Sequence, residues 1–341
     1  MSSTMDLLLT GDHFYYIVST NCQQNNMLST KLEDLPNEII TKVLSYLDIR
    51  DLFCFGHISK RTRTISRDKA VWRKLTIHNQ TLKSRLLKFM LRNGCKFLKL
   101  INVRLKGFLH LRKASRLQEL YLDRCAIKTP ALEEFLASCH SLKKFVLRGI
   151  DLSDVNEHIL KLFVLQNKNT LQTLDLRMSK RLNFGSIKFI VHNCNELTEV
   201  TIIRYFYDKH CEMLSEASIN YLAKNLTEKV VKLNLGSQRY FKDEHAMKLI
   251  KRCKRITELN LNGTSITHNS LTCIIENLKH SLEILRLCNT KLYLNELLQL
   301  RSMSKLKVLN CSHLIFCPND LKHLKEALPD LSILLKHSKF T

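Results

Sequence analysis

The residues of this chain that could carry out chemistry are its 12 cysteines and 14 histidines. Cys311, His313 and Cys317 lie close enough in sequence to hold a zinc ion, and His210 beside Cys211 could form a base and a nucleophile. The first group has no evident fourth ligand, and a surface loop explains the second group as well as a catalytic pair does. We therefore predict no metal site and no catalytic residue.

The other sequence motifs of enzymes are also missing. The chain has no CxxC pair, no HExxH, no GxSxG and no glycine-rich phosphate loop, and it contains only 8 glycines. The sequence thus gives no support to an enzyme and implies no cofactor. We expect a non-catalytic protein that works by binding.

A repeated pattern of apolar residues fills the chain from residue 72 onward. Apolar residues recur at positions i, i+3 and i+5, as in Leu117, Leu120 and Leu122. Copies of the pattern start at 72, 95, 117, 142, 171, 197, 230, 256, 282 and 306. These ten copies are typical of leucine-rich repeats, in which each turn of a horseshoe-shaped solenoid holds a short strand and a helix. A degraded copy at 328–335 is expected to cap the stack.

The segments between the expected strands predict helices. The clearest examples are 130–139, 215–226, 242–253 and 319–328, with Asn319 as a candidate N-cap. Three cysteines each precede the next repeat start by three residues, namely Cys139, Cys194 and Cys253. That recurrence predicts small buried hydrophobic residues at one fixed place in the solenoid.

The composition predicts a folded protein outside the membrane. Hydrophobic residues make up 45% of the chain, and no run approaches the roughly 18 apolar residues of a membrane span. The first 20 residues contain two acidic and no basic side chains, so they form a poor secretory signal. We therefore expect the nucleus and cytoplasm, where cysteines stay reduced.

The net charge of +23 is concentrated in one block. Residues 60–113 hold 17 Lys or Arg against one acid, Asp68, a net +16 that leaves +7 for the rest of the chain. Such a block could bind nucleic acid or an acidic protein, or it could be a solvated basic surface. Its aromatic residues fit buried repeat positions at least as well as a nucleic-acid site, and they are Trp72, Phe89, Phe97 and Phe108. A scaffold that binds nucleic acid is therefore the alternative that we do not favour.

Several arginines are expected on the concave face of the solenoid. Strand side chains alternate between two faces, so positions i+4 and i+6 of each repeat project onto that face. Arg148 and Arg177 occupy equivalent sites in adjacent repeats, about 5 Å apart by strand spacing. One interpretation is a site for an acidic or phosphorylated segment, and the other is neutralisation by Asp123 and Asp175. An aromatic insertion in the repeat at 197–230 is a further binding candidate.

The segment 32–75 has features of a different kind. It begins with Leu35 and Pro36, continues with an apolar helical pattern, and closes at Trp72. This ordered set resembles an F-box, so the chain is similar to the F-box/leucine-rich-repeat family. One departure is Thr62, where many family members carry an aromatic residue.

The first helix of this segment has two apolar lines, which require two surfaces to bury them. The two lines are Leu35, Ile39 and Val43, and Ile40, Leu44 and Leu47. In the family, an F-box docks on the Skp-type adaptor of a cullin–RING ubiquitin ligase. The resemblance implies adaptor contacts by Leu32, Leu35, Pro36, Ile39, Val43, Leu47 and Leu52. Any one of these residues could instead belong to the core of the module.

The resemblance also implies that the concave face binds a protein substrate. One family member binds a phosphorylated cell-cycle regulator there, with the help of a small Cks-type accessory protein, and Arg239 matches a basic residue of that face. The candidate substrate-binding residues are Tyr121, Arg124, Arg148, Asp175, Arg177, Arg204, Arg239 and Arg286.

Together these patterns predict an α+β protein, with a small all-α F-box of three helices followed by an α/β leucine-rich-repeat solenoid of about ten repeats. The expected divisions are a short N-terminal arm at 1–30, the F-box at 31–75, the repeats at 72–327, and a C-terminal cap and tail at 328–341. The expected function is that of a non-catalytic substrate receptor in an SCF-type ubiquitin ligase, which commits a bound protein to proteasomal degradation.

Overall fold

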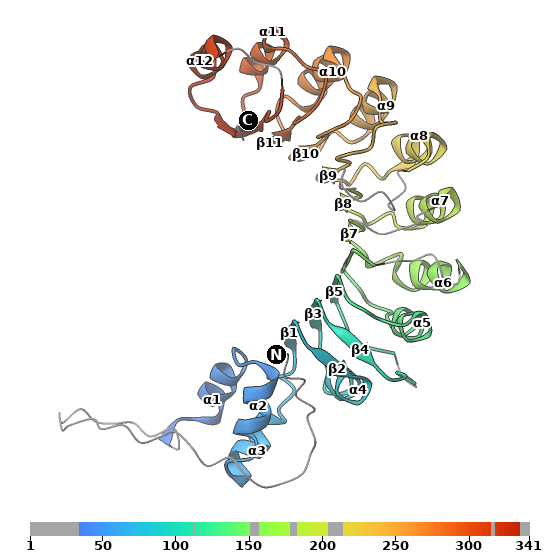
Figure 1. Ribbon diagram of the computed structural model, residues 1–341, viewed down its shortest axis with the longest axis vertical. Coiled ribbons are helices and arrows are strands. Elements are labelled where there is room, and N and C mark those ends of the chain that lie inside the picture. Colours follow the sequence, from blue (N-terminus) through green and yellow to red (C-terminus); the bar gives the residue numbers. More distant parts are fainter. Residues whose placement is uncertain are drawn as a thin grey trace, which may run out of the picture.

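The chain folds into a curved solenoid with a small helical module at its N-terminal end (Figure 1). The structure is a computed structural model, and it describes residues 34–111, 114–150, 157–177, 183–203, 214–314 and 318–334. The expected N-terminal arm at 1–30 lies outside these residues. None of the helices described is long and apolar enough to cross a membrane.

The N-terminal module consists of three short helices, α1 (Asn37–Leu44), α2 (Ile49–Phe55) and α3 (Lys60–Ser66). Local capping explains where the last two begin. The carboxylate of Asp48 accepts a 2.8 Å hydrogen bond from the backbone N–H of Asp51 at the start of α2. Ser59 and Thr62 form a reciprocal capping box at the start of α3. Thr62, the departure from the F-box pattern, therefore stabilises the third helix.

The solenoid is built on an eleven-stranded parallel sheet in which neighbouring strands follow one another in chain order. Its strands are β1 (Lys74–His78), β3 (Phe97–Ile101), β5 (Glu119–Asp123), β6 (Lys144–Arg148), β7 (Thr173–Asp175), β8 (Glu199–Thr201), β9 (Lys232–Asn234), β10 (Glu258–Asn260), β11 (Ile284–Arg286), β12 (Val308–Asn310) and β13 (Ser332–Leu334). A second sheet, parallel and two-stranded, pairs β2 (Thr81–Lys83) with β4 (Arg104–Lys106).

The helices lie on the outside of the curve and the main sheet lines its inside (Figure 1). They are α4 (Ser84–Arg92), α5 (Thr129–Ala137), α6 (Glu157–Asn167), α7 (Phe184–Asn193), α8 (Glu216–Asn225), α9 (Asp243–Arg252), α10 (His268–Leu278), α11 (Leu294–Leu297), the 3-10 helix η2 (Leu298–Ser302) and α12 (Pro318–Ala327). The main sheet therefore offers a continuous concave face.

The repeat pattern predicted this architecture correctly. Ten strands coincide with the ten predicted copies, and β13 lies in the degraded terminal copy, where it pairs with β12. The leucines of the pattern stack in register, as in the pairing of Leu98 with Leu120. One detail was wrong: α12 begins at Pro318, so Asn319 is inside the helix and is not its N-cap.

One backbone feature ends the strands of this sheet. The residue seven positions after each repeat start has a left-handed backbone conformation, with positive φ, wherever the structure describes it. These residues are Asn79, Asn102, Arg124, Gly149, Ser237, Gly263, Asn289 and His313. The left-handed turn directs the backbone N–H of each of the first seven to a carbonyl oxygen of the next repeat. Asn and Gly adopt this conformation with little strain, whereas a long side chain such as that of Arg124 (φ 51°) is uncommon there.

A single hydrophobic core runs through both parts of the chain, from Ile40 to Leu328. The predicted inward cysteines belong to it, since Cys139, Cys194 and Cys253 are buried. Burial raises the pKa of the Cys139 and Cys253 thiols to about 11. These thiols therefore stay protonated near neutral pH and act as small apolar residues.

The core is continuous because Trp72 joins the helical module to the first repeat. Its ring lies 5.8 Å from that of Phe53 on α2 and 4.9 Å, edge to face, from that of Phe89 on α4. The indole N–H donates a buried 2.8 Å hydrogen bond to the carbonyl oxygen of Ser66. The indole therefore contacts helices on both sides of the junction.

Candidate functional site

The first candidate surface is the exposed side of α1, which we call the apolar face. It comprises Ile39 and Val43, which lie four residues apart on one side of the helix, with Pro36 at the N-cap and Tyr46 just beyond the C-cap. Ile39 and Val43 are about half exposed (47% and 48%), and Tyr46 is 81% exposed. The described residues place nothing over this face. Sequence reasoning did not include Tyr46 in it, although its position three residues after Val43 was a usable signal.

The other side of α1 packs into the module. Ile40 and Leu44 are almost fully buried, and Leu35 and Leu47 are half-buried against the same core. Leu52 on α2 is only 1% exposed, so it is a core residue and not an adaptor contact as the sequence suggested. Its burial reflects the packing of α2 against α3, which a motif match does not report.

The start of the apolar face is held in place by Arg61 on α3. Its guanidinium donates hydrogen bonds of 2.9 and 3.0 Å to the side-chain oxygen of Asn37, and one of 2.6 Å to the carbonyl oxygen of Leu35. These bonds fix the entry into α1 and thereby the position of Pro36. Leu32, the remaining predicted contact, lies outside the described residues.

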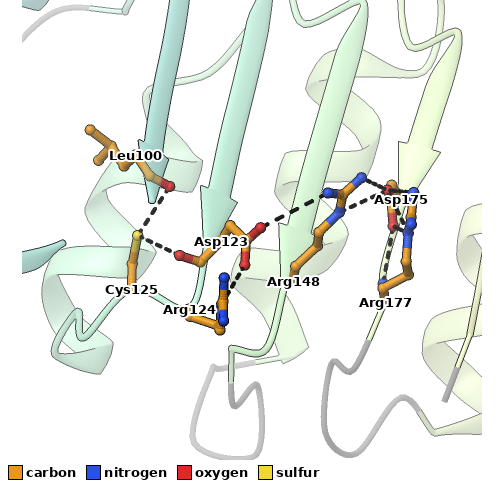
Figure 2. A network of polar contacts seen from close by, with 7 residues as sticks. All are labelled: Leu100, Asp123, Arg124, Cys125, Arg148, Asp175 and Arg177. Atoms are coloured by element: carbon orange, nitrogen blue, oxygen red, sulfur yellow. Dashed lines mark hydrogen bonds and ion pairs between the residues drawn. The ribbon is translucent and has the colours of Figure 1, made fainter. Parts of the chain in front are cut away.

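The second candidate surface is the concave face, where five charged side chains form a continuous network (Figure 2). We call it the arginine–aspartate ladder, and its members are Arg124, Asp123, Arg148, Asp175 and Arg177. Asp175 accepts from both Arg148 (2.7 Å) and Arg177 (2.8 Å). Asp123 lies 3.2 Å from Arg124 and 3.9 Å from Arg148.

The ladder favours neutralisation over the other interpretation of the concave arginines. Each aspartate bridges two arginines, so three positive charges face two negative ones. Asp175 is buried, with 6% of its side chain exposed, and Arg148 and Arg177 are about one-third exposed. The guanidinium groups are thus largely occupied by their neighbours. The aspartates therefore largely neutralise the charge of the arginines, and the network stiffens this part of the concave face.

The ladder gives a prediction about stability. Replacing Asp175 by Ala leaves Arg148 and Arg177 side by side without their shared acceptor. We expect the free energy of unfolding to fall by about 2–3 kcal/mol, the scale of a hydrogen bond to a charged group. Asp175→Asn keeps one acceptor oxygen and should lose less. Urea unfolding followed by circular dichroism measures both variants, and equal stability of Asp175→Ala and the wild type contradicts the prediction.

On the later strands, too, the basic side chains are paired with acidic ones. Lys232 on β9 lies 2.8 Å from Glu258 and 3.7 Å from Glu199, and the hydrogen bond to Glu258 raises the pKa of this lysine. Arg286 on β11 lies 4.0 Å from the same Glu258. Of the predicted substrate-binding residues, Arg286 therefore belongs to a separate group on the same face.

The remaining predicted residues are dispersed. Tyr121 lies on β5 beside the ladder and donates a 3.0 Å hydrogen bond to Glu119, and burial raises its pKa. Arg239 is exposed in the segment between β9 and α9, beyond the strand itself. Arg204 and the aromatic insertion (Tyr205, Phe206 and Tyr207) lie outside the described residues.

Sequence reasoning missed a third group on the concave face, at its N-terminal end. Lys74 and Phe97 are register partners on β1 and β3, and the Lys74 Nζ lies 5.2 Å from the Phe97 ring centroid. Lys99 and Lys144 lie over the Tyr121 ring, at 6.0 and 5.6 Å from its centroid. These residues occupy positions i+2 and i+4 of their repeats. The charges of Lys74 and Lys99 had been attributed to the 60–113 block as a whole, and Lys144 lies outside that block.

The described residues of that basic block are distributed over several elements. Lys74 and Lys99 lie on the concave face, Lys88 on the outer helix α4, and Lys106 on the separate small sheet. Phe108 was expected to be buried, yet it is 65% exposed and stacks on a histidine, because its strand has already ended at position 106.

Among the described residues, no group of three or more His, Cys, Asp or Glu side chains could hold a metal ion. Cys311 occupies the inward position that the repeat predicts and is fully buried, and Cys317 lies outside the described residues.

The three-helix module and the solenoid define an F-box protein with leucine-rich repeats. Residues 32–78 match the F-box-like family, and residues 85–341 match the family described as the SKP2 LRR domain. The second match spans most of the chain, and the chain therefore belongs to the SKP2 LRR domain family. This confirms the resemblance to the F-box/leucine-rich-repeat family that was seen in the sequence. Members of the F-box/leucine-rich-repeat family are typically non-catalytic adaptors.

A relative and two solved structures are similar to this chain. An F-box/FBD/LRR-repeat protein of Arabidopsis thaliana is 25% identical over 186 residues, which cover 51% of this chain and 42% of that protein. The chain thus spans less than half of that relative's length.

Of the two solved structures, the Rad7–Elc1 complex in yeast shows 16% identity and a TM-score of 0.43, over 89% of this chain and 90% of that one. The complex of latrophilin 3, Unc5D and the FLRT2 repeats shows 16% identity and a TM-score of 0.40, over 77% of this chain and 82% of that one. At these TM-scores neither structural likeness adds to the family assignment.

Proposed function

We propose that this protein is the substrate-recognition subunit of an SCF-type (cullin–RING) E3 ubiquitin ligase. The observation that carries the proposal is the exposed apolar face of α1 within an F-box module. Exposure of apolar side chains such as Ile39 and Val43 to water is unfavourable. A contiguous apolar surface of this kind is characteristic of a partner interface. A Skp-type adaptor that covers the apolar face links the chain to the cullin and RING subunits.

The solenoid supplies the other half of the proposed function. Its concave face is broad, polar and rigidly supported, and it binds a protein substrate. The chain contributes proximity, because it holds the substrate near the ubiquitin-loaded enzyme and needs no catalytic residue of its own. Ubiquitination then directs the substrate to the proteasome. The proposed sites of action are the nucleus and the cytoplasm, in keeping with the free thiols of the described cysteines.

The SKP2-type repeats support a more specific form of this proposal. In that form the substrate is a cell-cycle regulator that carries a phosphorylated segment, and a Cks-type accessory protein assists its binding. Affinity capture from cells, with the proteasome and cullin activation blocked and the partners identified by mass spectrometry, tests it. Recovery of cullin without any Cks-type protein or cell-cycle regulator contradicts the specific form and leaves the general one in place.

The general form is tested by co-expression of the full chain with a Skp-type adaptor. We expect the two proteins to elute together in size-exclusion chromatography and to recruit purified cullin and RING subunits. A chain that elutes folded and alone, with the adaptor in a separate peak, contradicts the proposal.

A further inference from the structure

The N-terminal end of the concave face carries a cationic surface that the proposed function has not yet used. We call it the lysine–aromatic platform, and it consists of Lys74, Phe97, Lys99, Tyr121 and Lys144. The two rings lie 5.2 Å apart on adjacent strands and form its base. The three ammonium groups stand over these rings at 5.2–6.0 Å from the centroids.

The charges of the platform are not balanced as they are elsewhere on this face. No carboxylate of the described residues forms an ion pair with Lys74, Lys99 or Lys144. Glu119 is the register partner of Lys144, and its carboxylate, which accepts the hydroxyl of Tyr121, places one negative charge beside these three positive ones. In contrast, the strands from β7 to β11 carry two basic residues and three acidic ones, which pair with one another or with arginines of the ladder. Positive potential therefore remains at one end of the concave face.

The ring contacts indicate which kind of anion fits. A single-stranded nucleic acid would stack its bases on free aromatic faces. Here, Lys74 stands over the Phe97 ring, and both Lys99 and Lys144 stand over that of Tyr121. What the platform presents to solvent is thus mainly ammonium groups, held by cation–π contacts, and these groups suit the carboxylates of a protein.

The spacing of the lysines indicates the shape of the ligand. Lys74 and Lys144 are three strand intervals apart, on β1 and β6, or about 14 Å at the usual strand spacing. A single phosphate group cannot reach both. An extended peptide, however, places side chains at i and i+4 on one side about 13 Å apart, with i+2 between them in reach of Lys99.

We propose that the lysine–aromatic platform binds an extended segment of a partner protein with acidic side chains at alternating positions. The segment crosses the strands, so that its outer carboxylates meet Lys74 and Lys144 and the middle one meets Lys99. This inference rests on the proposed function and deepens it, because it names the chemistry that a substrate must present at this end of the solenoid.

The test measures peptide binding to the full chain by fluorescence anisotropy. The probe is a labelled Ser/Gly peptide with three glutamates at alternating positions, and its partner has three consecutive glutamates. The platform variant carries Lys74→Gln, Lys99→Gln and Lys144→Gln. The matched control carries Lys88→Gln, Lys106→Gln and Lys128→Gln, which lower the net charge equally on surfaces away from the platform.

We expect the alternating probe to bind the wild type more tightly than the consecutive one. The platform variant should bind the alternating probe at least about tenfold more weakly, from the loss of three solvent-exposed ion pairs. The matched control should bind as the wild type does, and both variants should keep the wild-type circular dichroism spectrum. Affinity should also fall as salt rises.

Four results overturn the inference. The wild type fails to bind the alternating probe, or the matched control loses as much affinity as the platform variant. A peptide with one phosphoserine in place of the glutamates binds more tightly through the same lysines, or a single-stranded oligonucleotide does so. Peptide binding is measured without the adaptor, so a failure here is distinct from a failure of adaptor co-elution, which concerns the proposed function.

Discussion

The double variant Ile39→Asp with Val43→Asp is expected to lose the Skp-type adaptor completely in co-purification. Both side chains are about half exposed in the chain alone, so the changes leave the core of the module intact. In a complex, the two carboxylates would be buried against an apolar surface without partners. A loss of about 2 kcal/mol at each of two central interface positions weakens binding roughly a thousandfold.

The control for this variant changes two exposed apolar residues on the outer helices of the solenoid, Leu165→Asp and Phe184→Asp. It alters charge and hydrophobicity in the same way but leaves the apolar face untouched, so the adaptor should still co-purify. Adaptor binding that survives in the Ile39/Val43 variant, at normal expression, would refute the proposed role of α1.

The substitution Trp72→Ala is expected to cause the largest loss of stability. Trp72 is 2% exposed and contacts aromatic rings on both sides of the junction between the helical module and the repeats. Truncation of a buried Trp to Ala lowers the free energy of unfolding by about 3–5 kcal/mol. We expect a lower urea midpoint by circular dichroism and a protease-sensitive site near residue 72.

The conservative variant Trp72→Phe separates packing from hydrogen bonding. It keeps much of the ring contact with Phe53 and Phe89 but removes the indole donor to the Ser66 carbonyl, for which we expect a loss of about 1–2 kcal/mol. Trp72 is the only tryptophan of the chain, so the fluorescence of the wild type reports on this junction directly. Equal stability of Trp72→Ala and the wild type would mean that the junction does not couple the two parts.

The two candidate surfaces have different physical characters. The apolar face on α1 is a short hydrophobic strip, whereas the concave face is polar and carries ion pairs. This difference agrees with the proposed function, in which the first surface holds a permanent adaptor and the second an exchangeable substrate. The ladder adds a rigid, nearly neutral segment next to the lysine–aromatic platform, so the positive potential stays localised on the first strands.

The sequence predicted most of the fold because the fold depends on local periodicity. The spacing of Leu117, Leu120 and Leu122, repeated with little variation, requires a strand that buries every second side chain in the same way. The inward cysteines followed from the same periodicity. On α1, the sequence likewise revealed two apolar lines but did not show which of them the module itself buries.

The sequence did not predict the side-chain contacts between neighbouring repeats. Asp175 lies 27 residues from Arg148 and two from Arg177, and only the strand register and the chosen rotamers make it bridge both. In the same way, Lys74, Tyr121 and Lys144 form one platform although 70 residues separate its ends. Periodicity is set by the backbone of one repeat, and the sequence alone determined it. Ion pairs and cation–π contacts depend on distances of a few ångströms between side chains of different repeats, and these distances were decided by the tertiary structure.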